Sequence, residues 1–136
     1  MEQIKQFFLQ DLYAQHSGIE LVSVSSGHAV ARMPIRPYHF NAVGRVQGGA
    51  IFTLADLAFA AASNSHGQVA VSINTSITFM GAASSGTLHA EARELTSNPR
   101  LGSYTVNVTD DDGALIAVFQ GLVYRKNQPL PLPDQQ

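Results

Sequence analysis

A long apolar segment limits the folds that this chain can adopt. Residues 50–62, AIFTLADLAFAAA, are mostly strong helix formers and contain no Gly or Pro. Apolar residues fall on every side of the predicted helix, which predicts a helix buried on all sides. The segment is too short to span a membrane. We therefore expect a fold that surrounds one central helix, predicted over residues 46–65, with its other elements.

Asp56 is the one charged residue in this apolar segment. A carboxylate in such surroundings is costly to ionise, so it needs hydrogen-bond partners, a raised pKa or a cavity in which it works. A structural carboxylate that accepts bonds from local donors is the alternative. Because Asp is a poor helix former and is rarely buried without a partner, we interpret Asp56 as a functional residue.

The composition indicates one globular domain. A chain of 136 residues with 45% hydrophobic residues can form a substantial core. Eight basic and ten acidic residues give a formal charge of -2 without a dense basic stripe, so nucleic acid is not an expected partner. The absence of cysteine excludes disulfides and thiol catalysis, and it is compatible with a reducing compartment. No secretory signal or membrane segment is visible, and we expect a cytoplasmic protein.

The rest of the chain is dominated by strand patterns. Residues 1–16 predict an amphipathic helix, because Ile4, Phe8 and Leu12 recur at fourfold spacing. Alternating or β-branched segments predict six strands, at 19–24, 28–33, 69–80, 87–95, 103–108 and 114–124. Residues 127–136 contain three prolines and are predicted to form a flexible tail. The prediction is an α+β fold in a single domain over residues 1–126, with an antiparallel sheet curled around the central helix.

Three short motifs follow one another in the middle of the chain. They are N-x-x-G-x-x-Q-G-G at 41–49, L-A-D at 54–56 and N-S-x-G at 64–67. Their order and spacing resemble those of the hotdog-fold thioesterases, and within them the phenylacetate-degradation (PaaI-like) acyl-CoA thioesterase group. The resemblance extends from about residue 18 to residue 125. It implies a hotdog fold, in which a six-stranded antiparallel sheet wraps around one long helix.

The resemblance also implies an activity and roles for three residues. Enzymes of this kind hydrolyse acyl-CoA thioesters to a free acid and CoA, so coenzyme A is part of the substrate and no cofactor is expected. Asp56 matches the carboxylate that acts as nucleophile or general base. Gly48 matches the glycine whose backbone N–H binds the thioester carbonyl, and Asn41 is similar to the residue that positions the water or the carboxylate.

Gly48 and Asp56 cannot act on one thioester from the same chain. Eight residues at 1.5 Å each separate them by roughly 12 Å along a helix. Two such helices packed antiparallel across a twofold axis would place Asp56 of one chain near Gly48 of the other. We therefore expect a homodimer with active sites at the interface, in agreement with the family, and pairing of dimers into a homotetramer stays open.

Further residues are candidates for substrate binding. The acyl pocket is expected to be lined by the loop 37–40, which contains His39 and Phe40, and by Phe59 and Asn64. Gln47 and Gly49 are further candidates for binding the substrate. For His39 a structural role is the alternative. The phosphates of CoA are expected near Arg93 and Arg100, with Arg125 as a third candidate. None of the five histidines has the spacing of a metal-binding motif, so no metal site is predicted.

Gln47 departs from the family pattern, in which a His usually precedes the two glycines. Gln donates and accepts hydrogen bonds but does not carry protons as His does. The alternative function is accordingly a non-catalytic hotdog protein that binds acyl-CoA. A hotdog hydratase is disfavoured, because such enzymes pair a His with the acid. The retention of the costly Asp56 favours the thioesterase.

Overall fold

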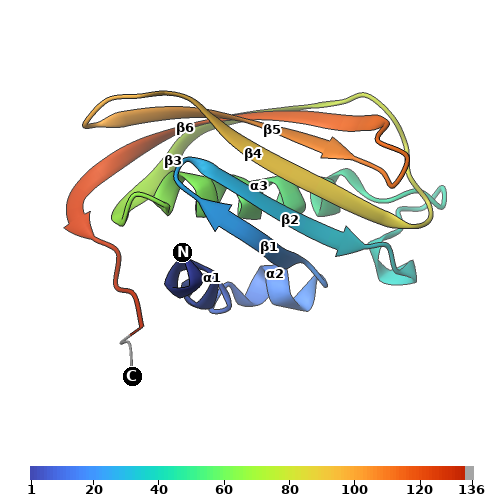
Figure 1. Ribbon diagram of the computed structural model, residues 1–136. Coiled ribbons are helices and arrows are strands. Elements are labelled where there is room, and N and C mark those ends of the chain that lie inside the picture. The colour runs from blue at the N-terminus through green and yellow to red at the C-terminus, as the bar shows by residue number, and fades with distance from the viewer. Residues whose placement is uncertain (134–136) are drawn as a thin grey trace.

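The computed structural model describes residues 1–133 and has one long helix beneath a curved antiparallel sheet (Figure 1). The helical elements are α1 (Glu2–Phe8), α2 (Leu12–His16), the short 3-10 helix η1 (Pro37–His39) and α3 (Gly48–Asn64). The strands are β1 (Glu20–Ser25), β2 (His28–Pro34), β3 (Gln68–Phe79), β4 (Thr87–Ser97), β5 (Leu101–Thr109) and β6 (Leu115–Pro129). Their order is β1-β2-β4-β5-β6-β3, and every neighbouring pair is antiparallel. The predicted six-stranded sheet around a central helix is confirmed.

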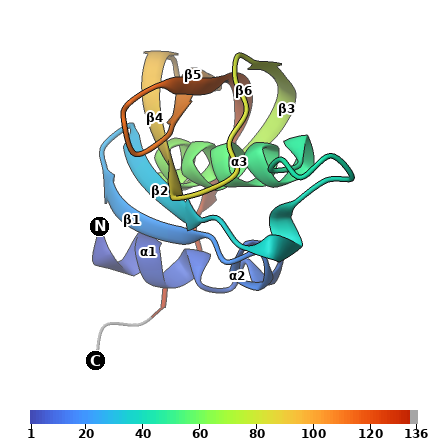
Figure 2. The same cartoon turned by 90° about the vertical axis from the view of Figure 1, so that its right-hand side faces the viewer.

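The central helix α3 packs against all the strands of the sheet, which arches over it (Figure 2). Small side chains make this close packing possible, because helix and sheet approach each other where only methyl groups intervene. These alanines have no accessible surface: Ala29, Ala31, Ala55, Ala58, Ala61, Ala62, Ala90 and Ala92. The helix spans Gly48–Asn64 and is therefore slightly shorter than the predicted range 46–65. It ends before Gly67, whose φ of 85° is a conformation that glycine adopts readily.

Aromatic rings fill the space between α3 and the strands β5 and β6. The ring of Phe59 lies 5.7 Å from that of Tyr104 and 5.3 Å from that of Phe119, measured between centroids. Gly121 on β6 faces the same ring, and a Cβ placed there would lie 2.5 Å from a Phe59 carbon. Any side chain at position 121 would therefore displace the aromatic ring that fills the centre of the core.

The amphipathic helix predicted over residues 1–16 is instead two short helices. Asp11 causes the break, because its side chain caps α2 by accepting the backbone N–H of Ala14 at 3.1 Å. The predicted apolar face divides accordingly. Ile4 and Ala14 are buried, whereas Leu12 is 74% exposed.

The predicted flexible tail over residues 127–136 is wrong for its first part. Strand β6 continues to Pro129, which pairs with Gln68 at the start of β3. Leu130 is buried, and its N–H donates to the carbonyl of Gly67 at 2.8 Å. Pairing with β3 thus extends β6 into the proline-containing segment that was predicted to be a flexible tail. Residues 134–136 lie outside the described part of the chain.

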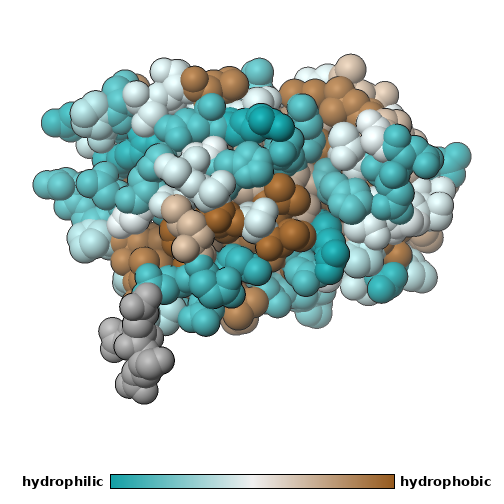
Figure 3. All heavy atoms as spheres, viewed as in Figure 1, coloured by the Kyte–Doolittle hydropathy of each residue, from teal (hydrophilic) through white to brown (hydrophobic). Residues whose placement is uncertain are grey.

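The face of the molecule seen in Figure 1 has mixed polarity. Hydrophilic residues cover most of it, and hydrophobic residues are exposed in a band across the middle (Figure 3). Among residues 1–133, no helix has the length and apolar character needed to cross a membrane.

Candidate active site

The N-terminus of α3 leaves backbone donors free. Gln47 precedes the helix in an extended conformation, and its carbonyl accepts the N–H groups of Ala50 and Ile51 at 3.0 and 3.3 Å. Within residues 1–133, the N–H groups of Gly48 and Gly49 have no acceptor. Free N–H groups at the positive end of a helix dipole attract negative charge. This end of α3 is therefore suited to a ligand oxygen.

Gly48 is in close contact with Phe79 at the end of β3. A Cβ on Gly48 would lie 3.0 Å from the ring, a closer approach than side chains normally make. Neither Gly48 nor Gly49 has a positive φ. The Phe79 ring thus leaves little room for a side chain at position 48, which explains why this residue is a glycine.

Asp56 lies two turns further along α3, and its side chain is only partly buried. No donor within the described residues bonds to its carboxylate. Burial raises the pKa of Asp56, and the negative charge of Asp11 raises it further. Of the three outcomes expected for a carboxylate in this segment, the structure shows the raised pKa.

Asp56 belongs to a row of α3 residues that the single chain leaves partly uncovered. The row also contains Gly49, Phe52, Thr53 and Ala60, which share one face of the helix because they are three or four residues apart. The prediction that α3 is buried on all sides is therefore wrong for this face of the single chain. We call these five residues the open row.

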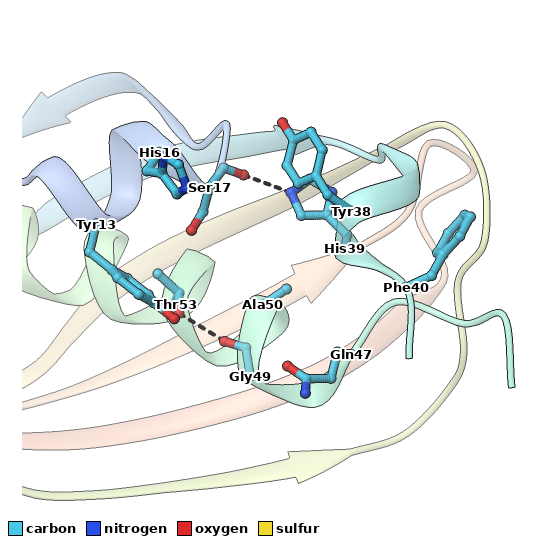
Figure 4. Close-up of a pocket in the computed structure, with 10 residues that line it drawn as sticks. All are labelled: Tyr13, His16, Ser17, Tyr38, His39, Phe40, Gln47, Gly49, Ala50 and Thr53. Carbon is cyan, nitrogen blue, oxygen red and sulfur yellow. Dashed lines mark hydrogen bonds between the residues drawn. The ribbon is translucent and has the colours of Figure 1, made fainter. Parts of the chain in front are cut away.

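A cavity of about 530 Å³ lies between α2, η1 and the first turns of α3 (Figure 4). It brings together four of the predicted binding residues: His39, Phe40, Gln47 and Gly49. Tyr38, from the loop 37–40 that was expected to line the acyl pocket, also borders it. The remaining lining residues were not predicted, and they are Tyr13, His16, Ser17, Ala50 and Thr53. Those on α2 are distant from α3 in the sequence and meet it only through the fold. Gly48 and Asp56 are not among the lining residues.

Asn41 holds the turn that leads into α3. Its Oδ1 accepts the backbone N–H groups of Val43 and Arg45 at 3.0 and 3.1 Å. Its own N–H donates to the carbonyl of Arg45 at 2.7 Å. The side-chain amide NH₂ has no partner among the described residues. It is therefore the part of this side chain that can meet a ligand.

Phe59 and Asn64, which we expected near the acyl pocket, both lie in the interior. Phe59 is 1% exposed and belongs to the aromatic core. The Asn64 amide donates to the carbonyls of Ala60 and Ala70 at 2.9 and 3.3 Å, and its Oδ1 accepts the Ala70 N–H at 2.9 Å. Asn64 thus connects the end of α3 to the start of β3, and neither residue lines the cavity.

The three arginines have different environments. Arg93 is held by Glu91 through contacts of 2.8 and 3.1 Å. Arg125 is buried, and it donates to two backbone carbonyls at 2.9 Å and to the hydroxyl of Tyr104 at 3.0 Å. Arg100 is exposed, with one bond of 3.3 Å to the hydroxyl of Tyr124. Only Arg100 keeps most of its donors available, and Arg125 is a structural residue.

No cluster of three or more potential metal ligands occurs among the side chains of residues 1–133.

Comparison with known proteins identifies the family. The model of the Thioesterase superfamily matches residues 43–117, a range that contains Gly48 and Asp56. The chain belongs to this superfamily. A putative esterase of Archaeoglobus fulgidus is 38% identical over 133 residues, which cover 96% of this chain and 86% of that protein. The acyl-coenzyme A thioesterase PaaI of Escherichia coli is 33% identical over 116 residues, covering 85% and 83%.

A solved structure agrees with these sequence relatives. The E. coli PaaI protein, from the phenylacetic acid degradation operon, superposes with a TM-score of 0.88 at 28% identity, covering 94% of this chain and 96% of that one. The predicted hotdog fold and PaaI-like thioesterase group are both confirmed, and with them the enzyme class, a thioester hydrolase.

Proposed function

We propose that this thioesterase hydrolyses acyl-CoA at two active sites, each shared between the subunits of a homodimer. The observation that carries the proposal is the Asp56 carboxylate, which has a raised pKa and no donor among residues 1–133 of its own chain. The relative named acyl-coenzyme A thioesterase PaaI supports acyl-CoA as the substrate. Such a substrate is already activated at its thioester carbon, so a carboxylate and a carbonyl-binding N–H suffice for hydrolysis.

The dimer follows from the surface that the single chain leaves open. The open row lies along α3, and the edge strand β3 ends in Phe79 and is followed by Met80, which are 50% and 58% exposed. A second copy related by a twofold axis would cover this apolar surface. In that arrangement Asp56 of one chain faces Gly48 of the other, which removes the separation of roughly 12 Å within one helix.

The reaction places charge where the site can stabilise it. Attack on the thioester carbon turns the carbonyl oxygen into an oxyanion, and the Gly48 N–H at the positive end of α3 donates to it. Collapse of this intermediate breaks the C–S bond, and CoA leaves as the thiolate, which then takes up a proton.

Asp56 can begin this reaction in either of two ways. As a general base it takes a proton from the attacking water, so that water adds directly to the thioester carbon and the acid forms when the C–S bond breaks. As a nucleophile it forms a mixed anhydride, which a water then hydrolyses to release the acid and restore the carboxylate. In both routes we assign the free amide of Asn41 to positioning the water or the carboxylate.

The remaining candidates serve substrate binding. Gln47 and Gly49, together with His39 and Phe40, border the cavity beside the helix N-terminus, where an acyl group can be accommodated. Arg100 is the best candidate for the phosphates of CoA, because its guanidinium is exposed and lightly bonded. Arg93 is a weaker candidate, because Glu91 already neutralises it.

A second function is favoured by one specific residue. Gln47 stands where the family usually has a His, and the alternative is an acyl-CoA-binding protein that does not hydrolyse its ligand. Thiol release from aromatic and aliphatic acyl-CoAs distinguishes the two. The thioesterase releases thiol, and Asp56→Ala abolishes the release, whereas a binding protein retains acyl-CoA intact.

Mixed dimers test whether the active site is shared. Asp56→Ala and Gly48→Pro should each leave a homodimer with at most about a hundredth of its activity, but a mixed dimer retains one site with both wild-type residues if the site spans the interface. Random mixing should restore about a quarter of the wild-type activity, since half of the dimers are mixed and each has one intact site. A mixture that stays inactive although subunits exchange would exclude the shared site.

A further inference from the structure

His39 is a buried titratable residue to which the proposed reaction gives no chemical step. It lies on η1, is 4% exposed and lines the cavity beside α3. Its Nδ1 accepts the backbone N–H of Arg36 at 3.0 Å, and its Nε2 faces the carbonyl of Ser17 at 2.6 Å (Figure 4). Both ring nitrogens are therefore already in use.

The two partners determine where the proton of the ring lies. A backbone N–H can only donate, so Nδ1 must be unprotonated, and a carbonyl can only accept, so Nε2 must carry the proton. This is the neutral tautomer with one donor and one acceptor. Neither nitrogen is free to take a proton from a substrate or a water, which excludes His39 as the general base in this arrangement.

The backbone of His39 completes a connection between three elements. Its carbonyl accepts the N–H of Gln47, the residue before α3, at 2.8 Å. Its N–H donates to the carbonyl of Arg36 at 2.9 Å, and the ring of Tyr38 packs on its ring at 4.5 Å between centroids. One residue thus joins Ser17 at the end of α2, η1 itself and the start of α3.

We propose that His39 is a positioning residue that holds the α2 wall of the cavity against the N-terminus of α3. The proposal rests on the proposed function in one respect, because it takes this cavity as the place where the acyl group binds. The bond from Nε2 to Ser17 fixes the α2 wall of the cavity. The bond from the His39 carbonyl to the Gln47 N–H fixes the residue that precedes Gly48 and Gly49, and so it positions their free N–H groups. Small displacements of such groups have large effects on binding and catalysis.

Two substitutions separate the bonds of the ring. His39→Asn places an oxygen near the position of Nδ1, so it keeps an acceptor for Arg36 but cannot reach Ser17. His39→Gln reaches further and places an NH₂ near the position of Nε2, so it keeps a donor for Ser17. His28→Asn is the matched control, because His28 also makes a side-chain bond, of 2.9 Å to Glu91, but lies on β2 away from the cavity.

The first readout is backbone hydrogen exchange, which needs no ligand and no activity. With His39→Asn we expect exchange to accelerate by about tenfold or more in peptides covering residues 12–18 and 44–51. With His39→Gln these peptides should stay within about threefold of the wild type, as they should with His28→Asn. Unchanged exchange in His39→Asn, or equal acceleration in both His39 variants, overturns the proposal.

The second readout is binding of S-butyl-CoA, a thioether that cannot be hydrolysed, by calorimetry. We expect His39→Asn to weaken binding about tenfold or more and His39→Gln less than about threefold. Equal affinity in all variants overturns the proposal. A wild type that binds S-butyl-CoA but releases no thiol from acyl-CoA contradicts the proposed hydrolysis alone. A wild type that does not bind it contradicts acyl-CoA as ligand, and the exchange result then decides the role of His39.

The tautomer can be tested in the wild type if His39→Asn does not fold. Nitrogen shifts of ¹⁵N-labelled histidine distinguish a ring protonated at Nε2 from one protonated at Nδ1 or at both atoms. The Nε2 atoms of His28, His66 and His89 face carboxylates and carry a proton as well, so the His39 signal is assigned by its loss in His39→Gln. We expect that signal to be the one of a ring protonated at Nε2 alone. A His39 protonated at Nδ1 would overturn the proposal.

Discussion

The two ends of α3 differ in whether their polar groups are hydrogen-bonded. At the C-terminal end, Asn64 makes three hydrogen bonds, and the Ser65 hydroxyl accepts the Gly27 N–H at 2.8 Å and donates to Ala62 at 2.7 Å. At the N-terminal end the N–H groups of Gly48 and Gly49 have no partner among residues 1–133, and neither does the Asp56 carboxylate in the middle of the helix. Satisfied polar groups hold the fold together, and the groups left free are the ones that can bind a substrate.

The largest expected effect comes from removing the free carboxylate. Asp56→Asn should lower kcat by about a thousandfold, because an amide is neither a base nor a nucleophile. The thermal midpoint should stay the same or rise, because the charged group is partly buried and has no donor among residues 1–133 of its own chain. Thiol release and a thermal scan measure both quantities.

The control for this substitution is Asp112→Asn, at an exposed Asp whose carboxylate has no bond within residues 1–133. It should leave kcat unchanged. An active Asp56→Asn protein would mean that the free carboxylate has no catalytic role.

A somewhat smaller effect is expected from removing a free N–H. Gly48→Pro eliminates this donor, and proline is well tolerated at the first position of a helix. We expect kcat to fall by about a hundredfold, the usual effect of losing one oxyanion donor. Gly48→Ala keeps the N–H and adds the same Cβ beside Phe79. If both variants lose equal activity, crowding of Phe79 and not the lost donor is responsible.

Arg125 on β6 belongs to the satisfied part of the molecule beyond the C-terminal end of α3, because it faces Glu94, which bonds to His66 just after the helix. Substitution there should cost stability without affecting the chemistry. Arg125→Met leaves the carbonyls of Asn98 and Leu101 without their buried donor. We expect a loss of about 2–3 kcal/mol in the free energy of unfolding, measured with urea, and unchanged kcat/KM below the transition. Arg32→Met removes an exposed ion pair with Glu20 and should cost less than about 1 kcal/mol. An inactive but stable Arg125→Met protein would contradict the division between the two ends.

A modest effect on substrate affinity is expected at Arg100. Arg100→Met should raise KM for acyl-CoA by about three- to tenfold with kcat unchanged, and the effect should shrink at high salt because it is electrostatic. Arg93→Met should change KM less, since Glu91 already neutralises that guanidinium. The opposite order of the two arginines would assign the phosphates of CoA to β4 instead.

The smallest expected effect is on the pH dependence of stability. Because the pKa of Asp56 is raised, the folded protein holds this proton more tightly than the unfolded chain does. The stability that this proton contributes is present at acidic pH and is lost as pH rises from the usual Asp value through the raised one. The thermal midpoint of Asp56→Asn minus that of the wild type should therefore be larger at about pH 7 than at about pH 4. A difference independent of pH would mean that the pKa is not raised.

Local patterns in the sequence were sufficient to predict the main elements of the fold. Alternation, β-branched residues and turn signals together predicted all six strands, and the uninterrupted apolar segment predicted α3. The break between α1 and α2 depends on one capping bond of Asp11, which competes with an otherwise helical pattern. The extension of β6 to Pro129 depends on pairing with β3, a partner distant in the sequence.

The candidate site was less predictable, because side-chain roles depend on tertiary contacts. His39, Gln47 and Gly49 are close in the sequence, and they line one cavity in the structure. Phe59 has the same apolar character whether it lines a pocket or fills a core, and only the fold decides between the two. Tyr13 could not be associated with the cavity, because it comes to line the same cavity as residues of α3 only when the N-terminal segment folds beside the central helix.

The contact between Gly121 and Phe59 bears on how the protein tolerates genetic change. A Cβ at position 121 would lie 2.5 Å from the Phe59 ring, so even alanine is too large there. In a library selected for thioesterase activity, position 121 should be as intolerant as position 56, although one residue serves packing and the other serves chemistry. A replacement at position 121 could become acceptable only together with a smaller residue at position 59, so these two positions should change in concert.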